Sequence, residues 1–118
     1  MSQTSVLTRP TAVGNTALPF LCSWQTGGSG AAWVHVAGEL DPASSPQLEE
    51  TLAEAQLAAR MVVLDLRELT SIELSGVHVI LDAADRARRR WGRLMLVRGP
   101  AEVDRKLTLS GALSLIHI

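Results

Sequence analysis

The sequence predicts an α/β fold in which strands alternate with helices and form a mixed, mostly parallel sheet. Two nearly continuous apolar runs, Met61–Leu66 and Arg93–Val97, are typical of buried central strands. Segments whose apolar residues recur every three or four positions lie before, between and after these runs, and that spacing predicts helices. Alternating strands and helices favour parallel neighbours with right-handed crossovers, in the order β-β-α-β-α-β-α.

The N-terminal part predicts a tail followed by a β-hairpin. Residues 1–16 are rich in Ser, Thr, Pro and Gly and have no apolar period, which indicates a flexible tail. Residues 18–25 suit a strand, and residues 31–38 suit a second one. Between them, residues 26–30 form a glycine-rich turn, because glycine adopts positive φ at little cost.

The first helix is expected directly after the break at Asp41-Pro42. Ser44 or Ser45 can cap its N-terminus, and Pro46 suits its first turn, where a missing N–H costs nothing. Its apolar face is expected to comprise Leu48, Leu52, Ala55 and Ala59.

Two further helices follow the two apolar runs. The second is expected from about Gly76 to Trp91, with Gly92 at its end, and a short third helix is expected after Gly99-Pro100, with Gly111 as its C-cap. The apolar face of the second helix comprises Val77, Ile80, Leu81, Ala84, Ala87 and Trp91, and that of the third comprises Val103 and Leu107.

Composition narrows the class of protein. The 118 residues fit one domain, over residues 17–118 after the tail. A net charge of -1 disfavours a nucleic-acid partner, and no apolar run is long enough for membrane insertion. A single cysteine, Cys22, excludes a disulfide framework and fits a reducing, cytoplasmic compartment.

The segment from Leu64 to Val77 is the most informative part of the chain. A buried strand ends at Leu66, a loop follows, and Ser75 stands where the second helix opens. One interpretation makes Ser75 the N-cap, because a hydroxyl oxygen can accept from exposed helix N–H groups. The other makes Ser75 a phosphorylation site, since a phosphate would be tolerated at the positive end of the helix dipole.

Five motifs in order give the chain a family resemblance over residues 18–111. It resembles a STAS domain, the module named from sulfate transporters and anti-sigma factor antagonists, which implies a STAS-like (SpoIIAA-like) α/β sandwich. The motifs are Gly38-Glu39-Leu40-Asp41, Val62–Leu66, Ser75-Gly76-Val77, Gly92-Arg93-Leu94 and Leu107–Gly111.

The resemblance implies a phospho-switchable protein-binding module. Unphosphorylated antagonists of this family sequester an anti-sigma factor serine kinase and so free a sigma factor for transcription. Phosphorylation of the serine before the glycine breaks the complex, and a phosphatase restores it. On that pattern Ser75 is the phosphoacceptor, and the expected partner-binding residues are Asp41, Glu73, Leu74, Ser75, Gly76 and Val77.

The sequence departs from the family pattern at two places. The family typically has Asp-Ser-Ser-Gly before the helix, whereas this chain has Glu73-Leu74-Ser75-Gly76, which keeps the acceptor hydroxyl but changes its neighbours. Family members usually continue past the Leu-x-Leu-Ser-Gly segment into a closing helix. The expectation is therefore a domain truncated at its C-terminus near Ala112, in which residues 113–118 are either a native strand or not native sequence.

Metal binding, cofactor binding and acid–base catalysis are less favoured by the sequence than protein binding. His35, His78 and His117 have no metal-ligand spacing, and no cofactor motif is present. Asp65, Glu68 and Glu73 could form a carboxylate set for acid–base chemistry, but a structural role for Asp65 is favoured. The expectation is thus a binding protein and not an enzyme. A non-phosphorylated STAS accessory subunit of a lipid or solute transport complex is the alternative.

Overall fold

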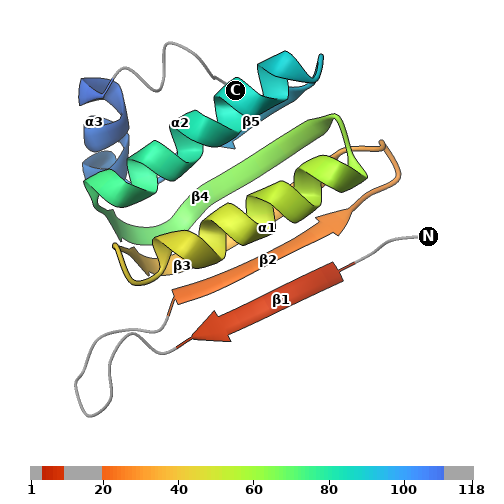
Figure 1. Ribbon diagram of the computed structural model, residues 1–118. Helices are drawn as coiled ribbons and strands as arrows, with labels where there is room; N and C mark the ends of the chain where they lie inside the picture. The colour runs from red at the N-terminus through yellow and green to blue at the C-terminus, as the bar shows by residue number, and fades with distance from the viewer. Residues whose placement is uncertain (1–3, 10–19, 111–118) are drawn as a thin grey trace.

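The strands form one five-stranded sheet in the spatial order β1-β2-β3-β4-β5 (Figure 1). This computed structural model describes residues 4–9 and 20–110 of the chain. The first three strands pair antiparallel, and the last three pair parallel. The strands are β1 (Thr4–Arg9), β2 (Phe20–Thr26), β3 (Ala32–Leu40), β4 (Met61–Ile72) and β5 (Arg93–Val97). The expected mixed α/β architecture is confirmed.

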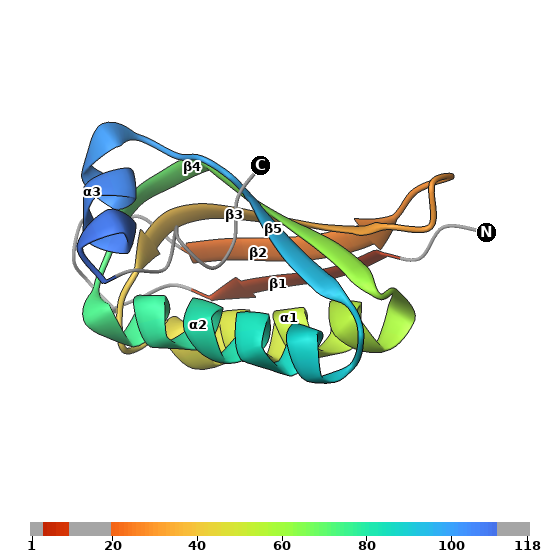
Figure 2. The same ribbon diagram turned by 90° about the horizontal axis from the view of Figure 1, so that it is seen from above.

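Three helices pack against this sheet. α1 (Ser45–Ala58) and α2 (Leu74–Arg89) lie side by side over one face (Figure 2), because each turns an apolar stripe toward the strands. α3 (Ala101–Leu109) lies at the end of the sheet where β4 finishes and contacts β4. The largest fully buried side chains of the resulting core are Phe20, Leu40, Leu48, Leu52, Leu64, Leu66, Leu69, Ile72, Ile80, Leu94, Leu96 and Leu107.

The hairpin and the first helix agree with their sequence predictions. β2 and β3 are joined by the glycine-rich turn, in which Gly30 has a φ of 84° and its N–H donates to the carbonyl of Gly27. α1 begins directly after Ser44 with Pro46 in its first turn. The expected apolar face is in the core, with Leu48, Leu52 and Ala55 fully buried and Ala59 partly buried.

β4 is longer than the sequence predicts. The apolar run ends at Leu66, but the strand continues to Ile72 and keeps pairing with β3. The register between the two strands shifts twice, once before the Ala37–Glu68 pair and once before the Glu39–Ser71 pair. Such bulges insert extra residues into one strand and interrupt its alternation. Arg67 and Glu68 are therefore exposed consecutively. Because the alternation of buried and exposed residues is broken there, the sequence pattern does not predict the second half of the strand.

Two other expectations are wrong for identifiable reasons. Residues 4–9 of the expected tail form β1, whose main chain pairs along β2 from Thr4–Gln25 to Arg9–Phe20. Strand pairing is a backbone interaction, so it needs no apolar period in the sequence.

Trp91, expected on the apolar face of the second helix, follows the end of α2 and is 89% exposed. The expected C-cap Gly111 and the expected terminal strand over 113–118 lie outside the described residues.

The burial of Cys22 predicts that its thiol reacts slowly with thiol reagents. Cys22 is 1% exposed beneath α1, and burial raises the pKa of its thiol from 9.0 to about 11, although a hydrogen bond with Thr51 partly opposes this shift. We expect dithionitrobenzoate at mildly alkaline pH to react with the guanidinium-unfolded chain far faster than with the folded one. Equal rates in the two states would contradict this burial.

The raised pKa of Cys22 also makes the stability of the fold depend on pH. A thiol whose folded pKa lies above its unfolded value stabilises the fold below about pH 9, and this contribution is lost as pH rises toward about 11. We expect the urea midpoint to fall over that interval, and to fall less in Cys22→Ala, measured by circular dichroism at several pH values.

Candidate functional site

α2 begins two residues earlier than an N-cap at Ser75 would require. Glu73 is extended, with φ -105° and ψ 170°, and its N–H donates to the carbonyl of Leu40 at 2.8 Å. The carbonyl of Glu73 then accepts from the N–H groups of Gly76 and Val77, at 2.9 and 3.2 Å. Glu73 is therefore the N-cap, and Ser75 is the second residue of the helix. The interpretation of Ser75 as the N-cap is wrong.

Gly76 allows α2 to approach the sheet closely at this point. A Cβ atom on Gly76 would lie 2.5 Å from Cδ2 of Leu40 and 3.1 Å from Cγ1 of Ile72. Leu40 and Ile72 are fully buried at the ends of β3 and β4, so neither side chain has room to move aside. The glycine in the Ser75-Gly76 pair thus has a packing role, and it holds Ser75 against the neighbouring α1.

A short chain of hydroxyl groups links Ser75 to α1. The Ser45 hydroxyl lies 2.7 Å from the carbonyl oxygen of Asp41 and 3.1 Å from the Ser75 hydroxyl. A hydroxyl has one proton, so when Ser45 donates it to Asp41, Ser75 is the donor of the bond between the two serines. The first turns of α1 and α2 therefore meet at these hydroxyls. The sequence singled out Ser45 only as a cap, and no local signal could pair it with Ser75.

The loop that contains Asp41 is held rigidly beside these two serines. Asp41 and Ser44 bond reciprocally: the N–H of Ser44 donates to Oδ1 of Asp41 at 2.9 Å, and the N–H of Asp41 donates to Oγ of Ser44 at 3.0 Å. The carboxylate of Asp41 thus fastens the start of α1. It lies in the same region as Ser75, as expected, but its bonds within the described residues are structural.

A shallow groove runs beside the start of α2. It is lined by Glu73, Leu74, Val77, Lys106, Leu109 and Ser110, so α3 supplies its second wall. Leu74 is 65% exposed and Leu109 is 80% exposed, whereas Val77 is 2% exposed at the base of the groove. Nζ of Lys106 donates to the carbonyl of Ile72 at 2.9 Å, which fastens α3 to the end of β4. Neither Lys106 nor Leu109 was among the expected partner-binding residues, although Leu109 belongs to the Leu107–Gly111 motif.

The predicted partner-binding residues divide into two groups. Glu73 and Leu74 are exposed, and Asp41 and Ser75 are partly exposed, so a partner can reach all four side chains. Gly76 and Val77 are buried and shape the site from beneath. The first turns of two helices, whose N-termini are the positive ends of their dipoles, meet here through Ser45 and Ser75.

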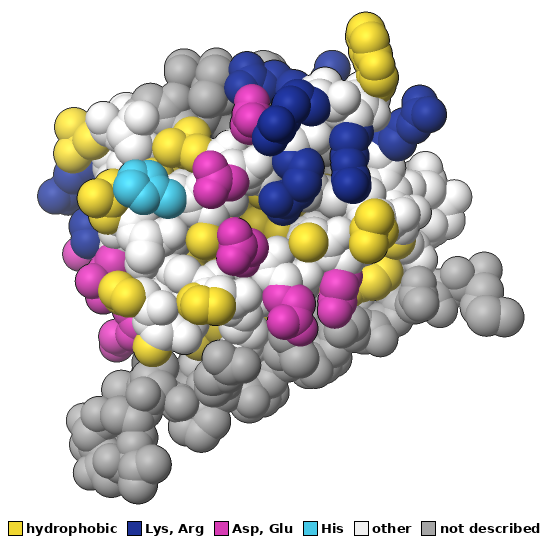
Figure 3. Space-filling view, in the orientation of Figure 1, with side chains coloured by type: hydrophobic (Ala, Val, Ile, Leu, Met, Phe, Trp, Pro, Cys, Tyr) yellow, Lys and Arg dark blue, Asp and Glu magenta, His cyan; other side chains and the backbone are white. Residues whose placement is uncertain are grey.

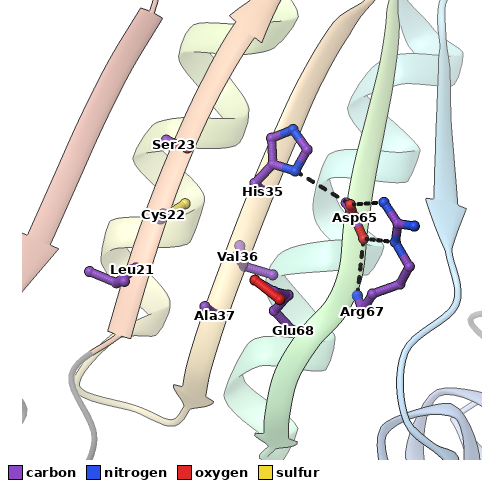
Figure 4. Close-up of a pocket in the computed structure, with 9 residues that line it drawn as sticks. All are labelled: Leu21, Cys22, Ser23, His35, Val36, Ala37, Asp65, Arg67 and Glu68. Atoms are coloured by element: carbon purple, nitrogen blue, oxygen red, sulfur yellow. Dashed lines mark hydrogen bonds and ion pairs between the residues drawn. The ribbon is translucent and has the colours of Figure 1, made fainter.

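The other carboxylates considered from the sequence lie elsewhere. Asp65 and Glu68 line a hollow on the sheet face opposite α1 and α2, while Glu73 lies at the start of α2 (Figure 4). Arg67 holds Asp65 with two side-chain bonds, of 3.0 and 2.8 Å, and Nδ1 of His35 is 3.3 Å from Oδ2 of Asp65. Within residues 4–9 and 20–110, no three His, Cys, Asp or Glu side chains are grouped to hold a metal ion.

Comparison with known proteins identifies the family. The family model described as the STAS domain matches residues 26–118. The chain belongs to the STAS family. A STAS relative from Bordetella bronchiseptica, named as the anti-sigma factor antagonist BtrV, is 34% identical over 82 residues, which cover 69% of this chain and 71% of the relative.

Solved structures show the same fold. The unphosphorylated form of the anti-sigma factor antagonist SpoIIAA superposes with a TM-score of 0.71 at 18% identity, covering 82% of this chain and 87% of that one. An anti-sigma factor antagonist from Mycobacterium paratuberculosis gives a TM-score of 0.69 at 16% identity, covering 97% and 83%. No helix among the described residues of this STAS domain is long and apolar enough to span a membrane.

The close packing at Gly76 predicts that this position tolerates no side chain. We expect Gly76→Ala to lower the free energy of unfolding by about 1–3 kcal/mol, because the new methyl group overlaps Leu40. Gly28→Ala is the matched control, since a Cβ on Gly28 would meet nothing within 4 Å. Urea unfolding of both variants measures the difference, and equal stabilities would contradict the packing role.

The Asp65 network predicts an acid-sensitive contribution to stability. Hydrogen bonds from Arg67 lower the pKa of Asp65 below its ordinary 3.8, although burial opposes the shift. A lowered pKa stabilises the fold above the unfolded value, and this contribution is lost as pH falls through the folded pKa. We expect Asp65→Asn to lower the urea midpoint at neutral pH and to flatten its fall in acid. Asp85→Asn, at a more exposed ion-paired carboxylate on α2, is the control, and it should lower the urea midpoint at neutral pH less, because exposed ion pairs stabilise little.

Proposed function

We propose that this STAS domain is an anti-sigma factor antagonist that binds an anti-sigma factor serine kinase through the start of α2. Phosphorylation of Ser75 dissociates the complex, and a phosphatase restores it. The protein acts by binding and catalyses no reaction itself. The observation that carries the proposal is the position of Ser75, a partly exposed hydroxyl in the first turn of α2 beside a groove with exposed leucines.

The unphosphorylated site suits docking. The groove offers the exposed side chains of Leu74 and Leu109 as apolar contacts, with Glu73 and Lys106 as charged groups at its edge. Leu74 stands where the family typically has a serine, so this chain has more apolar surface at the site. Covering such side chains favours association, because apolar area leaves water.

Phosphorylation opposes docking without unfolding the domain. A phosphate adds a charge of about -1.5 to -2 near pH 7. It would stand in place of the hydroxyl group that is bonded to Ser45, two residues from Glu73, so a partner would have to desolvate added negative charge. The N–H groups of the first turn of α2 can donate hydrogen bonds to the phosphate oxygens, and the fold would therefore tolerate the modification.

Mapping the phosphate tests the switch directly. We expect incubation with a kinase-type anti-sigma factor and ATP to add one phosphate at Ser75, identified by mass spectrometry of peptides, and Ser75→Ala to remove it. A phosphate that forms on another residue, or continued phosphorylation of Ser75→Ala, would contradict the assignment of the acceptor.

Binding measurements test the consequence for the partner. We expect Ser75→Glu to weaken the complex at least tenfold in calorimetry, because it puts a carboxylate where docking removes water. Ser29→Glu is the matched control, since Ser29 is exposed in the β2–β3 turn at the opposite end of β3. An affinity unchanged by Ser75→Glu would contradict the switch and favour an accessory subunit that docks without phosphorylation.

The groove makes a separate prediction. We expect Leu74→Ala to weaken the complex by about 1–2 kcal/mol, mainly through faster dissociation. Leu57→Ala is the matched control, because Leu57 is 77% exposed near the other end of α1. Surface plasmon resonance separates the two rate constants, and equal dissociation rates for both variants would place the docking surface elsewhere.

A further inference from the structure

α2 ends in a conformation that its sequence does not favour. Arg90 caps the helix, the N–H of Trp91 donates to the carbonyl of Arg88 at 3.2 Å, and the N–H of Gly92 donates to that of Ala87 at 2.8 Å. These two bonds define a Schellman motif, in which the residue after the cap adopts positive φ and is usually glycine. Here that residue is Trp91, with a φ of 60°, the one positive φ outside glycine among the described residues.

Neither backbone preference nor packing accounts for this tryptophan. A bulky residue at positive φ costs conformational energy that glycine would not cost. The side chain does not recover it in the core, because Trp91 is 89% exposed. Gly92 is needed next to it, since a Cβ there would collide with the carbonyl oxygen of Arg60. A large apolar ring is thus held out from the surface at a structural cost.

Positive charge is gathered at the same end of the molecule. Figure 3 shows Arg and Lys side chains clustered over the C-terminal half of α2. Asp85 pairs with Arg88 and Arg89, at 3.2 and 2.9 Å. Of the described carboxylates, none forms an ion pair with Arg60, Arg90 or Arg93. The chain as a whole has a net charge of -1, so its charge is strongly segregated.

A small hollow lies within this arginine cluster. It has a volume of about 180 Å³ and lies between the ends of α1 and α2, with Arg60 on one side and Arg90 on the other. Its remaining wall is formed by Gln56, Ala59, Ala87 and Gly92. Arginine at two of the lining positions suits a phosphate group, which a guanidinium binds through paired N–H donors.

We propose that this end of the domain, defined by Arg60, Arg90, Trp91 and Arg93, docks on an anionic lipid bilayer. Trp91 enters the headgroup region, and the arginines contact lipid phosphates. An exposed indole surrounded by arginines matches the residues that anchor proteins at membrane interfaces. Trp91 is 89% exposed and stands next to Arg90 in the chain, which places an amphipathic ring beside a positive charge.

The bilayer surface is independent of the site around Ser75. The two lie at opposite ends of α2, whose 16 residues span about 24 Å. A domain resting on a membrane through Trp91 would keep its groove available to a protein partner. The docking is peripheral and needs no segment that crosses the bilayer.

Vesicle binding by the full chain tests the proposal. We expect the protein to sediment with phosphatidylcholine vesicles that contain phosphatidylglycerol and to dissociate from them at high salt. We expect no binding to vesicles of pure phosphatidylcholine. Trp91→Gly should reduce the partition about tenfold while raising the urea midpoint, because glycine relieves the strained φ. This pairing separates a loss of binding from a loss of folding.

Charge variants complete the test. Arg60→Gln combined with Arg90→Gln should weaken vesicle binding at least tenfold, whereas the control Arg98→Gln combined with Arg105→Gln, at exposed arginines elsewhere, should have a much smaller effect. Absence of binding to anionic vesicles, or binding indifferent to Trp91, would overturn the proposal. Binding to polyglutamate but not to vesicles would also overturn it and assign the surface to an acidic protein segment.

Discussion

The close contact between the first turn of α2 and the ends of β3 and β4 positions the rest of the candidate site. Gly76 lies directly against Leu40 and Ile72, and the N–H of Glu73 bonds to the carbonyl of Leu40. These two interactions fix where α2 begins and how near it comes to α1. Because of them, the hydroxyl of Ser75 meets that of Ser45, and Leu74 is left facing solvent.

α2 has different chemistry at its two ends. Its N-terminus combines a serine, two nearby carboxylates and an apolar groove, which suits a protein partner whose binding responds to added negative charge. Its C-terminus has arginines and a projecting indole, which suits an anionic surface. The helix dipole is consistent with both ends, because a phosphate is stabilised near the N-terminus and arginine near the C-terminus. One rigid helix can therefore present two separate surfaces.

Sequence patterns located the elements well where packing is regular. The alternation in β3 and the spacing of apolar residues in α1 correspond directly to their buried faces. The patterns failed where the backbone departs from a simple period. Two bulges put Arg67 and Glu68 on the surface together and concealed the second half of β4. Trp91 matched the helical period of α2, but the helix ends at Arg89, before the period reaches it.

By itself, the sequence determined the alternation of strands and helices, the hairpin turn, most of the core and the Ser75-Gly76 pair at the start of a helix. These features depend on residues a few positions apart, whose spacing directly reflects local geometry. Only the tertiary structure decided that β1 pairs with β2, that Ser45 meets Ser75 across 30 residues, and that Lys106 and Leu109 complete the groove. Such contacts join distant parts of the chain, so they depend on how the helices pack on the sheet and leave no periodic signal.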